Sequence, residues 1–285
     1  MDKTEGAVEA GAYEPRRGTA VAPRGGRIPV ADARRNLPTK LFVVFSALLA
    51  ALSLALLKLD WGKIVERTPK LGRVFREMTR FSAEKFSLTV AAMAETVAVS
   101  VLSLIYGLLT GLVLGALAAR NITPWKPLAG VLKGAFAFIR AVPTAVWVLL
   151  VLASMGFGMA AGVVGLLFHC AAFFGKVFAQ IFEEVPEETI EAVRSTGAGR
   201  LQVFFGAALP ASLSGIIAWT ALRFETNYVE AAILGMVGAG GIGYTMTAAM
   251  NGYKYGRAGL AVVIVFAFAL MIELLTTFIK RKLKV

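Results

Sequence analysis

The glycines of residues 238–243 have a spacing that could serve nucleotide chemistry. From Gly238 to Gly243 the segment matches the pattern G-x-G-x-x-G, and it follows the apolar run 231–237. In dinucleotide-binding enzymes such glycines let the backbone approach a pyrophosphate closely. One interpretation of the chain is therefore an oxidoreductase that binds its cofactor at Gly238–Gly243.

The residues after this cluster argue against a nucleotide site. The dinucleotide fingerprint needs an acidic residue about 20 positions further on, whereas no Asp or Glu occurs between Glu230 and Glu273. The same stretch has the spacing of a P-loop, but Tyr244 stands where that motif requires lysine. We therefore expect neither NAD nor ATP to bind here. Such glycines also suit a backbone that bends at membrane depth.

The residues that commonly bind metal ions are too few to form a site. His169 and Cys170 are the only histidine and the only cysteine of the chain, and they adjoin each other inside an apolar run. A metal site needs three or four converging ligands, so we expect no metal site and no cofactor. A single cysteine also excludes an intramolecular disulfide.

A polar stretch at residues 183–203 combines acidic side chains with signals that begin and end a short helix. Pro186 suits the first turn of a helix, and acids that follow it complement the helix dipole. Gly197 can take the left-handed conformation that ends a helix. A solvated loop and a protruding helix gripped by a soluble partner both fit this pattern. The glutamates of the stretch are Glu183, Glu184, Glu187, Glu188 and Glu191.

Five ionisable residues lie inside or at the edge of apolar runs, where an unpaired charge is costly. In one interpretation the bases give a translocation path a positive field suited to an oxyanion. In the other, one of the two arginines pairs with one of the two glutamates and holds helices together. The five residues are Arg140, Lys176, Arg223, Glu225 and Glu230.

The elements that position these residues are apolar runs of membrane length. The chain has 285 residues and a hydrophobic content of 57%, and its mean hydropathy is +0.70, which is too apolar for an ordinary soluble domain. Several runs reach about 20 residues, the length that a helix needs to cross a bilayer. The sequence therefore predicts an all-α, polytopic membrane protein with about six transmembrane helices.

The formal charge of +12 collects at the ends of the apolar runs. Basic side chains there anchor to lipid headgroups and set orientation. We therefore expect membrane lipid, and not nucleic acid, to be the partner of this charge.

The predicted spans include two positions where glycine or proline shapes the helices. Residues 126–154 are expected to begin as an interfacial helix and to kink at Pro143 on entering the membrane. Gly107, Gly111 and Gly115 form a smooth strip that lets another helix approach closely. The six expected spans are residues 41–57, 96–119, 126–154, 159–182, 203–222 and 258–279.

Three segments of different composition divide the chain. Residues 1–39 are predicted to be a disordered cytoplasmic tail. Residues 40–89 are predicted to hold an N-terminal transmembrane helix and an external amphipathic segment, whose helix is expected to break at Pro69. Residues 90–285 are predicted to form the main transmembrane domain, with the polar stretch 183–203 between two of its spans.

The polar stretch resembles the signature loop of ABC-importer permeases, in which Glu-Ala-Ala is followed by Gly and later by Leu-Pro. Here the matching residues are Glu191-Ala192, Gly197 and Leu209-Pro210, while Val193 replaces the second Ala and Ala207 replaces the usual Ile. The resemblance implies that residues 183–203 are a coupling loop that docks onto a cytoplasmic ATPase. The residues it implies for ATPase coupling are Glu188, Glu191, Ala192, Gly197 and Arg200.

Three further segments, residues 140–144, 223–225 and 234–243, resemble phosphonate-type permeases, so that the likeness spans residues 90–285. It implies the core of a type I ABC-importer permease. It also implies a translocation path with the candidate residues Arg140, Pro143, Glu225, Gly238, Gly240 and Gly241.

The function implied by the resemblance is the permease subunit of an importer that moves phosphonate or a related phosphorus oxyanion by alternating access. Phosphite, hypophosphite, phosphate and methionine stay open as cargo, and a membrane oxidoreductase is the remote alternative. The implied partners are a second copy of the chain, a cytoplasmic ABC ATPase dimer and an extracytoplasmic substrate-binding protein. The implied location is the bacterial inner membrane with cytoplasmic termini. The partner ATPase would hydrolyse ATP, so this chain is not expected to be an enzyme.

Overall fold

A computed structural model describes residues 37–282, and every regular element in that range is a helix. The predicted all-α fold is therefore confirmed. Most of the predicted tail, residues 1–39, lies outside the described residues. The elements are α1 (Leu37–Leu56), α2 (Trp61–Met78), α3 (Phe86–Ala118), α4 (Lys126–Ala141), α5 (Thr144–Met155), α6 (Met159–Glu183), α7 (Glu187–Arg194), α8 (Arg200–Val203), η1 (Phe204–Ala208), α9 (Leu209–Leu234), η2 (Gly235–Ala239), α10 (Gly241–Asn251) and α11 (Tyr255–Lys282).

The chain divides into two units, Met1–Glu66 and Arg67–Val285. The first holds α1, a 20-residue helix with a mean hydropathy of 2.1, and the start of α2. The expected break of the amphipathic helix at Pro69 was wrong, because α2 runs through this residue. Proline removes one N–H donor, which frees the carbonyl of Val65, and Val65 is an exposed residue. Water can hydrate that carbonyl, so the helix continues.

Within residues 37–282, five helical runs are long and apolar enough to cross a membrane. A sixth span results if α4 and α5 count as one, bent by 87° at the break between them. Pro143 lies in that break, so the expected kink is confirmed. The five runs are Leu37–Leu56, Phe86–Ala118, Met159–Glu183, Arg200–Ala239 and Tyr255–Lys282.

The fifth expected span, residues 203–222, is too short in comparison with the structure, where one helical run extends over Arg200–Ala239. The charges that suggested an end to the span pair along the same helix, since Arg223 binds Glu230 at 3.1 Å. A charge with a partner is far less costly inside a membrane than a free one. The helix therefore continues past both residues into the glycine cluster.

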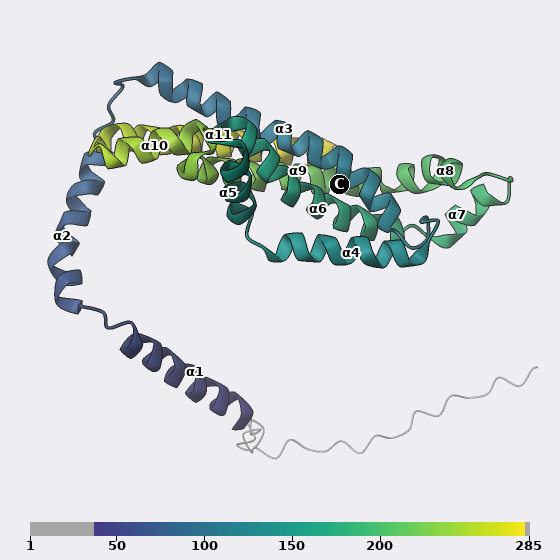
Figure 1. The fold of residues 1–285 in the computed structure, drawn as a ribbon, viewed down its shortest axis with the longest axis horizontal. Helices are drawn as coiled ribbons and strands as arrows, with labels where there is room; N and C mark the ends of the chain where they lie inside the picture. Colours follow the sequence, from purple (N-terminus) through teal and green to yellow (C-terminus); the bar gives the residue numbers. More distant parts are fainter. Residues whose placement is uncertain (1–36, 283–285) are drawn as a thin grey trace, which may run out of the picture. The chain divides into compact units, whose positions relative to one another are not determined.

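Helix α4 runs alongside α6, in the opposite direction (Figure 1). Lys133 reaches Glu183 at the last residue of α6, and Phe136 packs against Gly175 further along it. The guanidinium of Arg140 then lies 5.3 Å from the ring centroid of Phe173. We therefore revise the expected interfacial placement, because α4 follows a membrane-length helix through much of its course.

The centre of the second unit is the contact between α3 and α6. The predicted glycine strip of α3 faces α6, where Gly107 meets Cys170 and Gly115 meets Phe178. At Gly111 an added Cβ would lie 2.3 Å from the Cβ of Phe174. The absence of side chains on this strip thus lets the two helices approach closely.

Gly111→Ala is expected to destabilise the protein, because a methyl group there would force α3 and α6 apart. Overpacking of this kind costs about 1–3 kcal/mol. Gly134→Ala is the matched control, because an added Cβ at Gly134 meets nothing within 4 Å and alanine favours a helix by about 1 kcal/mol. Thermal unfolding in detergent measures both variants. A Gly111→Ala protein as stable as the control would contradict the tight contact.

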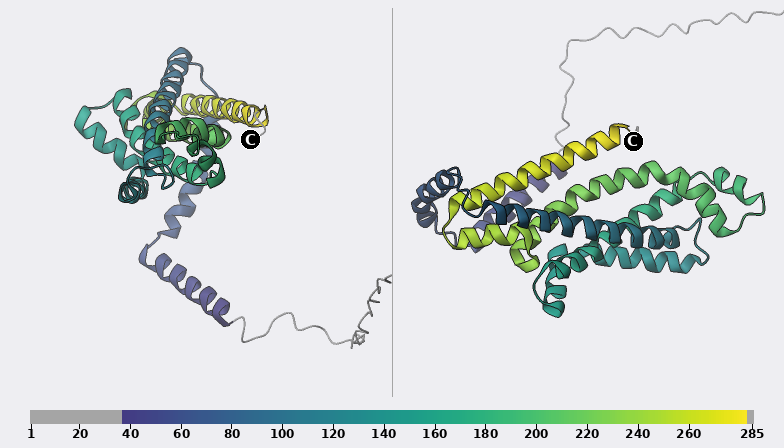
Figure 2. Two further views of the ribbon diagram at one scale, coloured as in Figure 1. Left: turned by 90° about the vertical axis from the view of Figure 1, so that its right-hand side faces the viewer. Right: turned by 90° about the horizontal axis from the view of Figure 1, so that it is seen from above.

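The two ends of the second unit carry different structures. Figures 1 and 2 show α7 and α8 at one end, beyond the last turns of α3 and α6, and α10 at the opposite end. The polar stretch and the glycine cluster of the sequence therefore lie far apart.

Candidate functional site

The predicted coupling loop is a short helix with a core of its own. Pro186 precedes α7, and Glu187 and Glu188 occupy the first helical turn, where acids complement the helix dipole. Val185, Ile190 and Val203 are buried against one another, with Val193 and Ala198 packed onto them. This cluster joins the start of α7 to α8 and so gives the segment a defined shape.

The outer face of α7 is exposed. Glu188, Glu191 and Ala192 all lie on this side, whereas Ile190 is only 2% exposed. The three outer residues are among those that sequence predicted for ATPase coupling. They form one surface on a helix held by apolar contacts from behind.

Gly197 ends the turn after α7 with a φ of +84°, so the predicted left-handed conformation is confirmed. Its N–H donates to the carbonyl oxygen of Arg194 at 3.0 Å. Before it, the hydroxyls of Ser195 and Thr196 donate to the carbonyls of Ala192 and Val193. An added Cβ at Gly197 would meet nothing within 4 Å. Backbone conformation, and not space, is therefore what requires glycine here.

An ion pair fixes the base of this segment. The Lys133 ammonium lies 2.7 Å from both carboxylate oxygens of Glu183, and the backbone N–H of Arg120 donates to the same carboxylate at 2.8 Å. The side-chain amide of Asn121 donates to the carbonyl of Phe182 at 2.7 Å. Sequence reasoning missed the pairing of Lys133 with Glu183. The available signal was a lone base inside one apolar run and an acid at the end of another.

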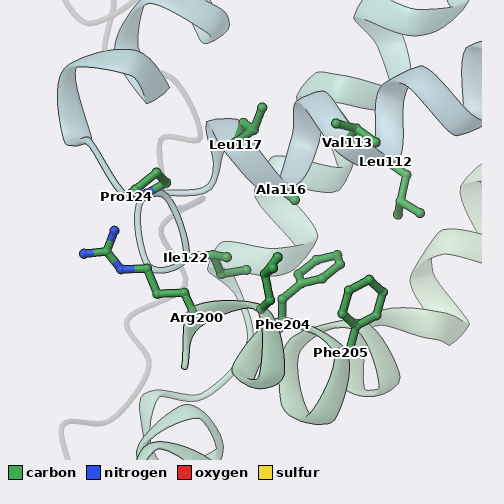
Figure 3. Close-up of a pocket in the computed structure, with 10 residues that line it drawn as sticks. Leu112, Val113, Ala116, Leu117, Ile122, Pro124, Arg200, Phe204 and Phe205 are labelled. Carbon is green, nitrogen blue, oxygen red and sulfur yellow. The ribbon is translucent and has the colours of Figure 1, made fainter. Parts of the chain in front are cut away.

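Arg200 lies where two cavities beside the predicted coupling loop, residues 183–203, meet. A polar cavity of about 320 Å³ is lined by Arg194, Arg200, Asn121 and Thr123, among others. An apolar groove of about 460 Å³ adjoins it. Figure 3 shows the rings of Phe204 and Phe205 in this groove and the guanidinium of Arg200 extending away from them. Arg200 is exposed and lines both cavities. It therefore lies between the outer surface of the segment and the bundle.

A second polar group lies deep in the bundle around Arg223, whose side chain is 4% exposed. Its two terminal nitrogens donate to the two carboxylate oxygens of Glu230 at 3.2 and 3.1 Å. It also donates to the side-chain oxygen of Asn227 at 3.3 Å. Of the two sequence interpretations, the pairing of an arginine with a glutamate is thus confirmed for Arg223 and Glu230.

Asn227 carries this polar group on to α3. Its amide donates to the carbonyl of Ser100 and to the hydroxyl of Ser103, both at 2.8 Å. Asn227 is fully buried, so each of these bonds replaces a bond to water. The network therefore joins α9 to α3 in the interior of the bundle.

Arg140 and Arg223 share one aromatic ring. Each guanidinium lies 5.3 Å from the ring centroid of Phe173, and Trp219 also contacts this ring edge-on. Arg140 is exposed, whereas Arg223 is buried. The predicted path residue Arg140 therefore lies next to the polar group, on its open side.

Of the other predicted path residues, Pro143 follows Arg140 by three positions, whereas Glu225 makes its contacts elsewhere. Pro143 is at the bend between α4 and α5. Glu225 accepts a hydrogen bond from the hydroxyl of Thr276 and lies 3.6 Å from the ammonium of Lys280, so its partners belong to α11. The structure does not bring these two residues together with the glycines of the cluster.

The glycine cluster makes the bend that joins α9 to α10. Gly238, Gly240 and Gly241 have φ values of +114°, +85° and +72°, which favour glycine. The N–H of Gly241 donates to the Glu95 carboxylate at 3.3 Å, and the N–H of Ile242 donates to the Thr96 hydroxyl at 2.9 Å. Sequence reasoning missed Glu95.

The elements on either side of these glycines are not those of a dinucleotide site. That fingerprint belongs to a turn between a strand and a helix, whereas here helices lie on both sides of the glycines. The start of α10 points its free N–H groups at Glu95 and Thr96 of α3. Over residues 37–282, no group of three or more His, Cys, Asp or Glu side chains could hold a metal ion.

Comparison with known proteins places this geometry in a family context. Residues 111–285 match the family model of the binding-protein-dependent transport system inner membrane component. The phosphate-import permease protein PhnE of Mycolicibacterium smegmatis is 33% identical over 75% of this chain, and the match covers 40% of that longer relative. The phosphite transport system permease protein PtxC of Stutzerimonas stutzeri is 26% identical over 79% of this chain and 82% of its own length.

A solved structure shares the fold. The inward-facing MetNI methionine ABC transporter has a chain that superposes with a TM-score of 0.62 at 23% identity. The superposition covers 71% of this chain and 99% of that one. At this level of identity the likeness concerns the arrangement of the helices.

Proposed function

This chain belongs to the family of binding-protein-dependent transport system inner membrane components, and from that membership we propose its specific task. It is the permease subunit of a bacterial ABC importer that moves phosphonate, or a related phosphorus oxyanion, by alternating access. The observation that carries the proposal is the coupling segment. Its outer residues stand on a short helix with its own buried core, at one end of a membrane-length bundle.

A segment of this kind suits docking onto a soluble partner. Glu188, Glu191 and Ala192 face outward, and Gly197 and Arg200 border the turn. The ion pair of Lys133 with Glu183 ties the base of the segment to α4 and α6. Movement of a docked ATPase dimer would therefore pass directly into helices that span the membrane.

The orientation follows from this docking. The coupling segment would lie in the cytoplasm, and α10 with the glycine bend would lie toward the outside. The basic end of α11, at Lys280, Arg281 and Lys282, agrees with a cytoplasmic C-terminus under the positive-inside rule. Six spans then bring the N-terminus to the same side.

The assembly we propose contains two copies of this chain, a cytoplasmic ABC ATPase dimer and an extracytoplasmic substrate-binding protein. ATP-driven closure of the ATPases would move the two coupling segments and open the permease to the outside. This chain would make and break no bond. Arg140 would line the path, with Pro143 setting the bend beside it. A path role for Glu225, Gly238, Gly240 and Gly241 stays a prediction.

The cargo class rests on relatives whose names refer to phosphate and phosphite. A further relative, from Escherichia coli strain K12, is named a putative cryptic phosphonate transport permease and is 28% identical over 41% of this chain. All three cargoes are tetrahedral phosphorus oxyanions. Phosphonate is our first choice, and phosphite, hypophosphite, phosphate and methionine are the alternatives.

Growth on single phosphorus sources tests the proposal. A deletion strain without redundant importers is grown on a phosphonate, phosphite, hypophosphite or phosphate, with and without this gene. We expect growth on the phosphonate to depend on the gene. Dependence on a different oxyanion would change the cargo and keep the mechanism. Growth on all four without the gene would contradict the assignment to phosphorus oxyanions.

A further inference from the structure

Helix α6 carries one polar stripe. His169, Phe173, Lys176 and Gln180 are spaced at i, i+4, i+7 and i+11, so they lie on one face of the helix. Most other residues in the second half of α6 are buried, while Lys176 and Gln180 are exposed. The bundle therefore leaves this face open at Lys176 and Gln180, whereas His169 and Phe173 are partly buried.

The stripe lies at membrane depth. At about 1.5 Å per residue, Phe173 is roughly 21 Å along the axis from the start of α6 at Met159 and roughly 15 Å from its end at Glu183. The hydrocarbon core of a bilayer is about 30 Å thick. Phe173 and the Arg140 guanidinium above its ring thus lie near the middle of the span, and Lys176 is about one helical turn closer to Glu183.

Arg140 and Lys176 are uncompensated cations. In the part of the chain that the structure describes, neither has a carboxylate within ion-pair distance. A free charge that faced lipid at this depth would be costly, and such residues normally face the bundle interior or a water-filled cavity. The open stripe of α6 therefore faces water.

Arg223 differs from these two bases. Glu230 and Asn227 take up its terminal nitrogens, so its charge is balanced and its position is fixed. Its guanidinium lies 5.3 Å from the ring centroid of Phe173, as does that of Arg140, but Arg223 is buried and Arg140 is exposed. The ion pair of Arg223 with Glu230 thus supports the ring of Phe173, and Arg140 lies beside this ring with its charge unpaired.

We propose that Arg140 and Lys176 form a mid-membrane binding site for a tetrahedral oxyanion, at which the permease selects its cargo by negative charge. This inference rests on the proposed function. An arginine can hold two oxygens of a phosphorus oxyanion at once, and a lysine acts as a point charge. Conduction also requires binding weak enough for release, which fits two single cations exposed to water.

The test uses the complete importer in proteoliposomes, with its ATPase and binding protein. It measures uptake of a labelled phosphonate together with ATP hydrolysis for Arg140→Gln, Lys176→Gln and the double variant. We expect the double variant to import at least about tenfold less phosphonate per ATP, equivalent to about 1.4 kcal/mol, with ATP hydrolysis unchanged. Lys126→Gln is the matched control, because Lys126 is an exposed base at the start of α4, the helix that carries Arg140. Uptake by this variant should equal that of the wild type.

Charge-conserving variants separate charge from shape. The pair Arg140→Lys with Lys176→Arg should retain most of the uptake per ATP, and it decides the question if the glutamine variants fail to assemble. Unchanged uptake in the assembled glutamine variants would overturn the site. Loss of uptake in the charge-conserving pair as large as in the double glutamine variant, with normal ATP hydrolysis, would overturn it as well. The wild-type complex is also assayed with phosphite, hypophosphite and phosphate. If it hydrolyses ATP but imports neither these three nor the phosphonate, the proposed cargo is overturned, and the site with it.

Discussion

Gly197→Val is expected to lower uptake and binding-protein-stimulated ATP hydrolysis together, by about tenfold, while membrane insertion stays normal. The φ of Gly197 is +84°, and a side chain in the left-handed region costs about 1–2 kcal/mol, more for a β-branched residue. Relief of that strain would turn the segment away from its docking position, and about 1.4 kcal/mol corresponds to tenfold. Insertion is measured as the amount of protein in the isolated membranes, and size-exclusion chromatography of the solubilised protein reports its folded state.

Gly199→Val is the control for this prediction. Gly199 lies in the same turn, but its φ is −70°, and the nearest atom to an added Cβ is 3.6 Å away. Valine therefore fits there without backbone strain, and coupling should be close to normal. Gly197→Asn should fall between the two, since asparagine tolerates the left-handed region. Normal uptake by Gly197→Val would contradict the docking geometry that we propose.

Arg223→Met is expected to cause the largest loss of stability among the variants considered. It leaves the carboxylate of Glu230, whose side chain is 26% exposed, without its cation. Breaking a buried pair by removing one partner costs about 3–5 kcal/mol. For a chain of this size, the thermal unfolding midpoint in detergent should fall by roughly 6–20 °C.

The double variant Arg223→Met, Glu230→Met should recover most of that loss. Removing both charges leaves no unpaired ion, and such replacements are often neutral or stabilising. The four proteins form a double-mutant cycle, in which residues in contact show a coupling energy. Additive effects of the two single substitutions would mean that the pair does not hold the bundle together.

The proposed coupling segment, residues 183–203, is the part of the molecule whose local structure could be predicted best from sequence. Pro186, the acids of the first turn and Gly197 act through local backbone chemistry, which depends on residues a few positions apart. The structure has α7 at Glu187–Arg194 and a left-handed Gly197, as these signals indicated. The close approach of another helix at Gly107, Gly111 and Gly115 could be predicted equally well, since small residues at steps of four form one smooth helix face.

Where partners are distant in sequence, the prediction was incomplete. Lys133 and Glu183 lie 50 residues apart, and Glu95 lies 146 residues from Gly241. Nothing local to either acid indicates which base or helix terminus it will meet. The helix through Pro69 and the long run past Arg223 were missed for a related reason, because a local interruption signal was outweighed by hydration or by pairing.

The sequence by itself determined the class of the protein, the approximate number of spans and the position of the short helix for which we propose a coupling role. Hydrophobic length, glycine and proline act on their own stretch of chain, so each of these follows from composition and spacing. Only the tertiary structure decided which charges are balanced. It paired Arg223 with Glu230 and left Arg140 and Lys176 open on one face, because the balance of a charge inside a membrane depends on which helices pack together.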